Sequence, residues 1–347
     1  MNEVWVLGAT GRTARAIASA LDEAGVSLAL AGRDRSRLDD AARALGSAPR
    51  LSVGPLEGLA AQFAAGPPAV VINTVGPFAL TAEQVLAGLP PGSHYVDVAN
   101  EYAALETVLG HDGDAVADGQ VLVTGAGFGV VATESIVVRV CESQPPATRV
   151  RVDALPSLAI APGAMGSALA GSIVESLPFG RRQVRDGRLI ATPFDDTPAR
   201  LRTPDGDALR TANFSSGDLL AAWRASRAQH VVAASSEVPS GLAARLALPT
   251  LSILAHSPRM RRIAIDRLAR TQLSSRERPR SCSWGHAWVQ WPSGLTGEGW
   301  LRAGDAMDFT AAAVAEVTLR LLRGEGRPGA YTPASLFGSG VAEAAGG

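Results

Sequence analysis

A glycine-rich turn at the very start of the chain restricts its fold more than any other feature. An apolar strand is predicted at 4–7 and a helix at 15–24, and between them lies the run Gly8-Ala9-Thr10-Gly11-Arg12-Thr13-Ala14. Glycines let the backbone approach a pyrophosphate, and a helix N-terminus offers N–H groups and a positive dipole end. The spacing, G-x-x-G-x-x-A, is a variant of G-x-G-x-x-G, but it stands in the strand-to-helix context that a dinucleotide site needs. We therefore predict cofactor contacts from Gly8, Ala9, Thr10, Gly11, Arg12 and Thr13.

The end of the second predicted strand, at 27–31, indicates which dinucleotide binds. NAD sites usually carry an acidic residue here that bonds the ribose hydroxyls, whereas an arginine accommodates a 2′-phosphate. The strand runs into Gly32, Arg33 and Asp34. A guanidinium suits phosphate because it donates paired, charge-assisted hydrogen bonds. Since Asp34 is equally suited to cap the next predicted helix, 35–45, we predict NADPH, with Arg33 at the 2′-phosphate.

Short apolar strands alternate with helices up to about residue 124, which determines the predicted fold class. The further strands are expected at 51–53, 69–73, 95–98 and 120–124, and the helices at 57–65, 81–89 and 101–118. Such alternation is typical of right-handed crossovers in a doubly wound, mainly parallel Rossmann sheet. Ligands of such sheets lie beyond the carboxyl ends of the strands, where the strand order reverses.

The pattern changes after Gly129 and predicts a second, α+β domain. A strand is expected at 149–155, a helix at 163–177, a hairpin with an Asp-Gly turn at 184–189, loops over 192–217 and a last helix at 309–322. We predict a NADP-binding Rossmann domain at 1–128 and an α+β substrate or dimerisation domain at 129–306. Residues 307–347 are expected to form a C-terminal helix and tail that returns to the Rossmann domain.

Composition excludes several classes of function. All 32 residues counted as lysine or arginine are arginines. Without lysine the chain has no Walker phosphate loop, no Schiff-base cofactor and no Tyr-x-x-x-Lys pair of short-chain dehydrogenases. The net charge of -1 gives no indication of a nucleic-acid partner. The two cysteines and five histidines lack ligand-like spacing, so no metal is expected. A first strand close to Met1 and the lack of a long apolar run predict a cytoplasmic protein without a signal peptide.

Two further clusters are predicted to complete the site. The run after the fourth strand contains Thr74, Val75, Gly76 and Pro77, whose small size suits the neighbourhood of the nicotinamide. Near the next strand stand the candidate proton donors, Tyr95 and His94, with Asp97 to orient them. Alternation places His94 on one face of the strand and the other two on the opposite face. Each is equally compatible with a satisfied buried polar group or a helix cap.

The segment 241–270 combines an apolar run, broken by Pro249, with an arginine-rich helix. A basic amphipathic helix can lie on a membrane surface or line an acyl pocket. The interpretation that we favour is a helix that packs on the core and turns an arginine face to solvent.

These motifs resemble the saccharopine dehydrogenase-like oxidoreductases, and within them the branch of trans-acting enoyl reductases. The similar runs are Gly8-Ala9-Thr10-Gly11, Ala31-Gly32-Arg33, Thr74-Val75-Gly76-Pro77-Phe78, Gly92 to Asp97, Gly127-Phe128, Met165-Gly166-Ser167, Val184 to Pro193 and Gly329 to Ala334. The resemblance implies a Rossmann domain, a second α+β domain, NADPH as hydride donor and a homodimer. The chain departs from the branch at Gly129, where an aspartate is usual, and at Asn100, where the branch has glycine.

The function predicted from the sequence is an NADPH-dependent reductase. It would transfer hydride to a C=C bond of enoyl type or to a C=N bond of a small or medium apolar metabolite. One alternative is a saccharopine-type oxidoreductase of secondary amines, in which arginines would bind substrate carboxylates; the candidates are Arg181, Arg182, Arg200 and Arg202. The other is a sensor or scaffold that binds NADPH without turnover, because a fold does not guarantee a function.

Overall fold

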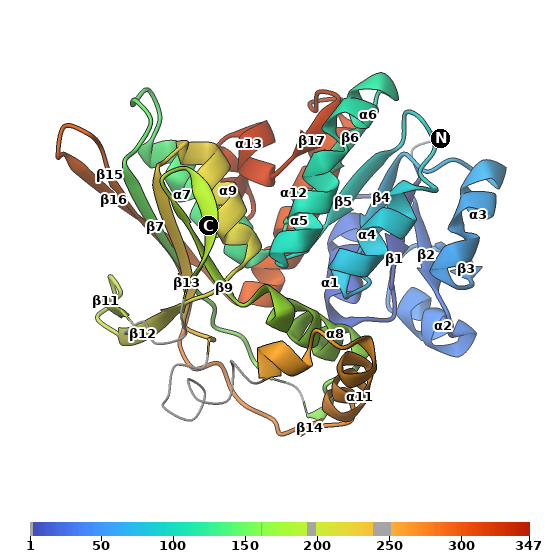
Figure 1. Cartoon of the computed structure of the whole chain (residues 1–347). Coiled ribbons are helices and arrows are strands. Elements are labelled where there is room, and N and C mark those ends of the chain that lie inside the picture. Colours follow the sequence, from blue (N-terminus) through green and yellow to red (C-terminus); the bar gives the residue numbers. More distant parts are fainter. Residues whose placement is uncertain (1–2, 161, 193–198, 239–250) are drawn as a thin grey trace. The chain divides into compact units, whose positions relative to one another are not determined.

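The computed structural model describes residues 3–160, 162–192, 199–238 and 251–347, and the chain divides into two compact units (Figure 1). Unit 1 consists of Met1–Ala99, Ala103–Val131 and Met307–Gly346. Unit 2 consists of Asn100–Tyr102, Ala132–Ala306 and the last residue. Each unit contains its own sheet and its own core.

Unit 1 is built on a seven-stranded sheet in which every pair of neighbouring strands is parallel. Its order is β17-β6-β5-β4-β1-β2-β3. The strands are β1 (Val4–Leu7), β2 (Leu28–Gly32), β3 (Arg50–Val53), β4 (Val70–Asn73), β5 (His94–Asp97), β6 (Val121–Val123) and β17 (Gly329–Tyr331). The predicted Rossmann sheet is therefore confirmed, with one strand, β17, that the sequence did not reveal.

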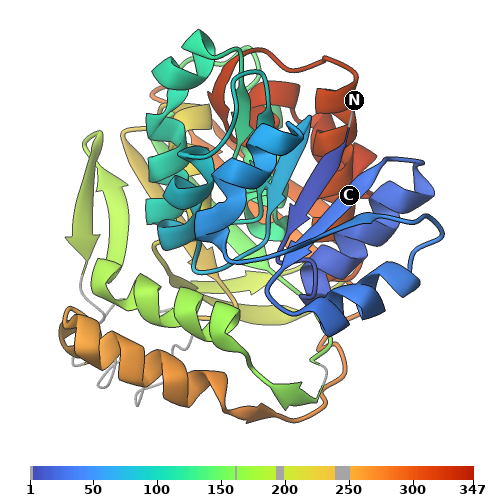
Figure 2. The ribbon, with the colours of Figure 1, turned by 90° about the vertical axis from the view of Figure 1, so that its right-hand side faces the viewer.

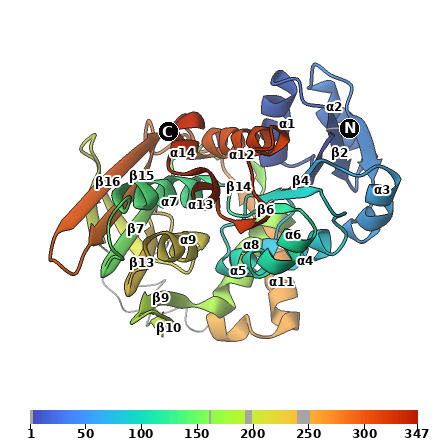
Figure 3. The ribbon, with the colours of Figure 1, turned by 90° about the horizontal axis from the view of Figure 1, so that it is seen from above.

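Helices cover both faces of this sheet, with α1 and α12 on one face and α4 and α5 on the other (Figure 3). The helices of unit 1 are α1 (Arg12–Glu23), α2 (Arg35–Arg43), α3 (Leu59–Ala65), α4 (Phe78–Leu86), α5 (Tyr102–Gly110), α6 (Asp112–Ala117), α12 (Ala306–Leu322), α13 (Pro333–Phe337) and α14 (Gly340–Ala344). Because both faces are covered, β1 is buried along its whole length and is apolar throughout rather than alternating.

The packing of Trp5 illustrates how the covered sheet gains stability. Trp5 is fully buried in β1, and its ring meets Phe63 of α3 edge-on, with ring centroids 5.0 Å apart. Such an aromatic pair contributes about 0.5–1.5 kcal/mol beyond the area that it buries. Its indole N–H donates to Glu3 over 3.0 Å, so the only polar atom of the ring is satisfied.

Unit 2 is built on an eight-stranded mixed sheet. The main path runs β10-β9-β13-β7-β15-β16, and β12 pairs with both β13 and β11. Its strands are β7 (Arg149–Leu155), β9 (Arg181–Arg185), β10 (Arg188–Thr192), β11 (Ala199–Arg202), β12 (Ala208–Asn213), β13 (His230–Ser235), β15 (Ser283–Gln290) and β16 (Thr296–Ala303). Of the described strand pairs in this sheet, only β13 and β7 run parallel. The predicted α+β character of the second part is confirmed.

Two helices, α7 (Phe128–Val140) and α9 (Gly217–Ser226), pack on this mixed sheet. The approach of α7 is close because β15 and β16 carry glycines where it crosses. A Cβ atom on Gly299 would overlap Cγ2 of Ile136, and one on Gly285 would lie 2.9 Å from Cβ of Ala132. Any side chain at these two positions would push the helix off the sheet.

A separate helix pair, α8 (Ser167–Ser176) and α11 (Pro258–Ala269), lies side by side in unit 2 (Figure 2). Short strands β8 (Gly163–Ala164) and β14 (Gln272–Leu273) pair next to them. None of the residues of α11 is buried, so the prediction that it packs on a core is wrong. The apolar run before Pro249 lies outside the described residues. No helix in the described ranges is long and apolar enough to cross a bilayer.

Most predicted elements are confirmed within a few residues. Strand 149–155 and the Asp-Gly hairpin occur as predicted, and Asp186 and Gly187 both adopt positive φ, as a tight two-residue turn requires. The prediction of loops over 192–217 is wrong, because β11 and β12 form a hairpin there. Arginines on both strands conceal the hairpin, since they interrupt the apolar pattern by which strands are recognised.

Candidate dinucleotide-binding site

The order of strands in unit 1 reverses between β1 and β4, which defines where a ligand binds. β1 pairs with β2 on one side and with β4 on the other, so that Leu7 lies opposite both Ala31 and Asn73. The carboxyl ends of the three adjacent strands β2, β1 and β4 therefore lie next to one another. Ligands of open α/β sheets lie at such a point, beyond the carboxyl ends of the strands.

The loops after β1 and β4 touch each other at Gly8. Its φ of +76° favours glycine, and a Cβ atom there would lie 2.9 Å from Oγ1 of Thr74 and 3.0 Å from Cγ2 of Val75. Thr74 also donates its hydroxyl to the carbonyl of Leu7 over 2.7 Å. A side chain at residue 8 would fill the space into which the two loops converge.

The amino end of α1 lies directly beyond this contact. Gly11 is its N-cap residue, and its first turn contains no acidic side chain that would neutralise the positive end of the dipole. The first turn of a helix directs its N–H groups outward along the axis, which suits an anion. Ala14, the last small residue of the motif, is fully buried and permits the close helix–strand packing that this position requires. These features fit a pyrophosphate.

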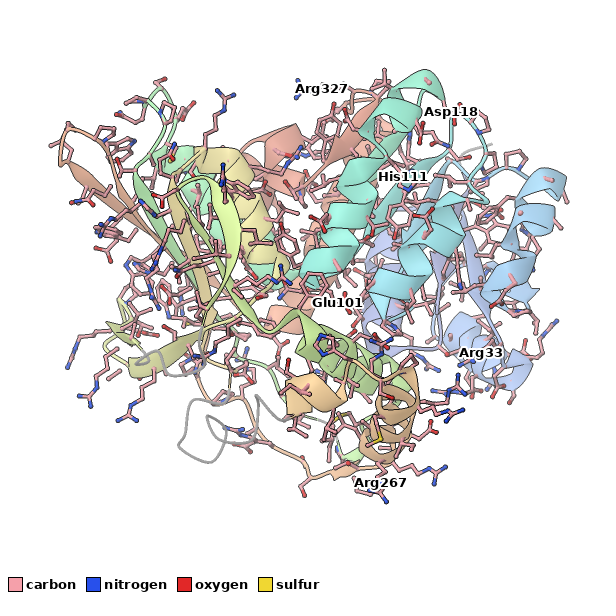
Figure 4. The ribbon with its side chains drawn as sticks, viewed as in Figure 1. Arg33, Glu101, His111, Asp118, Arg267 and Arg327 are labelled. Atoms are coloured by element: carbon pink, nitrogen blue, oxygen red, sulfur yellow. The ribbon has the colours of Figure 1, made fainter. Side chains whose placement is uncertain are left out.

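Arg33, labelled in Figure 4, follows the end of β2, where the sequence predicts the 2′-phosphate. Asp34 is the next residue along the chain. Arg33 is exposed, and its side chain forms no hydrogen bond or ion pair with any residue that the structure describes. Asp34 caps α2, because its carboxylate accepts the N–H of Arg37 over 3.1 Å. The capping role predicted for Asp34 is confirmed. Arg35, two residues further on, is paired with Asp39. Arg33 is the cation nearest the end of β2, and its side chain has no partner among the described residues.

Asp97, at the end of β5, fixes the loops around the site. Its fully buried carboxylate accepts four donors: the N–H groups of Ala99 and Gly125 at 3.0 and 2.9 Å, the hydroxyl of Thr124 at 2.9 Å and the phenol of Tyr95 at 3.0 Å. Burial raises the pKa of Asp97, and these hydrogen bonds offset that effect only in part. The carboxylate thereby ties the chain segments that leave β5 and β6.

Tyr95 extends this network to β4. Its hydroxyl accepts the side-chain amide of Asn73 over 3.2 Å, and Asn73 in turn accepts the N–H of Val75 over 3.0 Å. Tyr95 is fully buried. The structure thus brings Tyr95 and Asp97 together as predicted, but their contacts favour a role in positioning the loop that contains Val75, Gly76 and Pro77.

His94 lies at the amino end of β5, opposite Val70, the first residue of β4. Its Nδ1 accepts the N–H of Val121 over 3.1 Å, and burial lowers the pKa of the imidazole. Cofactor and substrate meet at the carboxyl ends of the strands, at the other edge of the sheet. The strand runs on to Asp97 and places His94 at the opposite end from the candidate site, so the role of His94 as a proton donor stays a prediction that its position does not favour.

The start of α12 lies beside the amino end of α1, at the end of the sheet where the dinucleotide is expected. Nothing in the sequence indicated this position. Thr13 donates its hydroxyl to the sulfur of Met307 over 3.0 Å, and Thr310 accepts the N–H of Phe128 over 3.0 Å. The rings of Phe128 and Phe309 meet edge-on at 5.7 Å. No local sequence signal marks these contacts, because they join positions that are far apart along the chain.

Unit 2 contains a buried ionic network of its own. Asp153 of β7 accepts two hydrogen bonds from Arg151, at 2.8 and 3.0 Å, and contacts Nδ1 of His286 at 3.0 Å and the hydroxyl of Thr211 at 2.7 Å. Burial alone would raise the pKa of Asp153, but these partners outweigh it and lower it. Among the described residues, no group of three histidine, cysteine or acidic side chains is arranged to hold a metal ion.

The arginines proposed for substrate carboxylates are placed differently from one another. Arg181 is buried at the start of β9, whereas Arg200 and Arg202 face solvent on β11. Arg182 lies over the ring of Phe179 at 5.0 Å and donates to the carbonyl of the same residue.

The fold is that of saccharopine dehydrogenase. The structure is similar to saccharopine dehydrogenase (L-glutamate forming) from Saccharomyces cerevisiae, with a TM-score of 0.61 and 13% identity, over 99% of this chain and 96% of that one. A short-chain dehydrogenase from Streptomyces avermitilis is similar over 35% of this chain and 63% of its own, with a TM-score of 0.32 and 17% identity. No model of a known protein family and no curated protein matches the sequence. The predicted homodimer and cytoplasmic location stay predictions.

Proposed function

We propose that this chain is an NADPH-dependent reductase that acts on a C=C bond of enoyl type, or on a C=N bond, in a small or medium apolar metabolite. The contact between the loops after β1 and β4 supports this proposal most directly. At Gly8 a Cβ atom would lie 2.9 Å from the hydroxyl of Thr74, so the two loops form a cradle that only glycine permits. NADPH would supply a hydride when bound, and the protein would supply binding and orientation.

The roles of the chain's own residues follow from their places at the edge of the sheet. Gly8, Ala9, Thr10, Gly11, Arg12 and Thr13 would hold the pyrophosphate, together with the amino end of α1. Arg33 would bind the 2′-phosphate. Thr74, Val75, Gly76 and Pro77 would border the nicotinamide, held in place by Asn73 and, through it, by Tyr95 and Asp97.

The consumption of NADPH in the presence of candidate substrates tests the proposal. We would compare α,β-unsaturated thioesters with cyclic imines, using the wild-type chain and Gly8→Val. The expected result is substrate-dependent oxidation of NADPH that Gly8→Val abolishes together with NADPH binding. Tight binding of NADPH by the wild-type chain, without turnover of any unsaturated substrate, would instead support the sensor or scaffold.

A secondary-amine oxidoreductase is the second candidate, and buried Arg181 favours it. A guanidinium removed from solvent, 4% exposed in this case, is suited to bind a carboxylate in a fixed direction. Turnover of an amino acid paired with a keto acid, lost in Arg181→Gln but retained in Arg200→Gln, would establish this activity in place of the reduction of apolar metabolites.

A further inference from the structure

We infer that the outer surface of the α8/α11 helix pair docks onto an anionic lipid membrane. This membrane-docking surface comprises the helical turn at 251–254, the exposed side of α11 and the adjoining part of α8. It is independent of the dinucleotide site in unit 1, so either proposal can fail without the other.

Large apolar side chains project from this surface into solvent. Ile253 is 72% exposed, Ile263 49% and Met260 41%. Ile173, Leu251 and Leu254 of the same surface are also exposed. Together these residues are six of the ten exposed large hydrophobic residues of the described chain. Apolar side chains that cluster in this way on a surface mark a site of interaction.

Cations surround these apolar side chains. Residues 251–270 contain five arginines and a single carboxylate, Asp266, in a chain whose net charge is -1. Arg261 is paired with Glu175 of α8 at 3.4 Å. The side chains of the other four form no ion pair or hydrogen bond with any residue in the described ranges; they are Arg259, Arg262, Arg267 and Arg270. The charge is therefore available to an external partner.

The helix presents both kinds of side chain on its outer face. Arg261, Ala264, Ile265, Leu268 and Ala269 are partly covered, as expected for the side turned towards α8. Met260 and Ile263 lie three positions apart on the exposed side, among the unpaired arginines. Arginine can keep its charge at the headgroups while its stem and the neighbouring apolar side chains enter the acyl boundary.

The combination of exposed apolar side chains and surrounding arginines favours a membrane over a second copy of this chain or a nucleic acid as the partner of this surface. A second copy of this chain, docked by a two-fold contact, would bring the same arginines face to face. A nucleic acid would satisfy the arginines but leave the apolar side chains in water. An anionic bilayer satisfies both, because it offers a negative surface above an apolar interior.

Co-sedimentation of the full chain with vesicles tests this inference. Phosphatidylcholine vesicles, with and without phosphatidylglycerol, would be compared at low and high salt. We expect binding only to the anionic vesicles, weakened by salt. Each arginine near such a surface strengthens binding by up to about fivefold. The combined variant Arg259→Gln, Arg262→Gln, Arg267→Gln and Arg270→Gln should therefore bind between about tenfold and about 600-fold more weakly, depending on how many of the four reach the headgroups.

Two further variants decide whether this surface is responsible. Ile253→Ser, Met260→Gln and Ile263→Gln together should also weaken binding, although they leave the charge unchanged. The matched control removes four exposed arginines from elsewhere in unit 2 and should bind normally: Arg185→Gln, Arg188→Gln, Arg210→Gln and Arg224→Gln.

Three results would overturn the inference. They are the absence of binding by the wild-type chain, equal loss in the control, and unchanged binding by the apolar variant. Self-association that the apolar variant abolishes, without vesicle binding, would assign the surface to a second copy of the chain.

Discussion

Replacing Gly8 by alanine should cost unit 1 more stability than the same change at a glycine with equal backbone strain. Gly8 has a φ of +76°, and its new Cβ atom would meet Thr74 at 2.9 Å and Val75 at 3.0 Å. A positive φ costs a residue other than glycine roughly 1–2 kcal/mol, and forcing a methyl group into a packed contact costs roughly 1–3 kcal/mol more. Gly8→Ala should therefore lose about 2–5 kcal/mol in total.

Gly25 supplies the matched control, because its φ is +74° and no heavy atom lies within 4 Å of the place that an added methyl group would take. Gly25→Ala should lose only the roughly 1–2 kcal/mol of backbone strain. Urea unfolding would measure both losses, and hydrogen exchange of β1 and β4 would localise them to unit 1. NADPH binding should weaken in Gly8→Ala alone. Equal losses in the two variants, or unchanged NADPH binding in Gly8→Ala, would refute the role assigned to the loop contact.

Three other changes probe separate parts of the structure. Asp97→Asn leaves donors on Ala99 or Gly125 without a carboxylate and should cost about 1–3 kcal/mol, with weaker NADPH binding; normal binding with a lower kcat would point to a catalytic role instead. The pKa of Asp153 is lowered in the folded state, so its carboxylate stabilises the folded chain. This contribution to the free energy of unfolding is fully present above the unfolded pKa of about 3.9 and is lost as pH falls through the folded pKa. Urea unfolding across that range should therefore show a steeper acid loss in the wild-type chain than in Asp153→Asn, and identical slopes would contradict this. Asp34→Ala removes the cap of α2 and should cost about 1 kcal/mol without changing the preference for NADPH over NADH, whereas a changed preference would place Asp34 at the ribose.

The Rossmann unit could be predicted because its signals are local. A covered parallel sheet requires continuous apolar strands, and the turn from β1 to α1 requires small residues, so both leave a mark within a few neighbouring positions. The cap at Asp34 is equally local, since its carboxylate and the N–H of Arg37 are three residues apart.

The parts that escaped prediction depend on contacts between distant residues. Nothing in the sequence around Met307 and Thr310 requires them to meet the loops of the dinucleotide site, so their place there could not be predicted. For His94, Tyr95 and Asp97, alternation correctly separated the histidine from the other two. Residue type alone could not distinguish a proton donor from a buried hydrogen-bond network, since both require the same polar groups.

A fluorescence titration with NADPH and NADH is the decisive test of the dinucleotide site. Wild-type chain, Arg33→Ala and the neighbouring control Arg35→Ala, whose side chain is already paired with Asp39, would be compared. We expect a strong preference for NADPH that collapses in Arg33→Ala and persists in Arg35→Ala. Binding of neither dinucleotide by the wild-type chain, or a preference for NADPH that Arg33→Ala leaves intact, would contradict the proposed site.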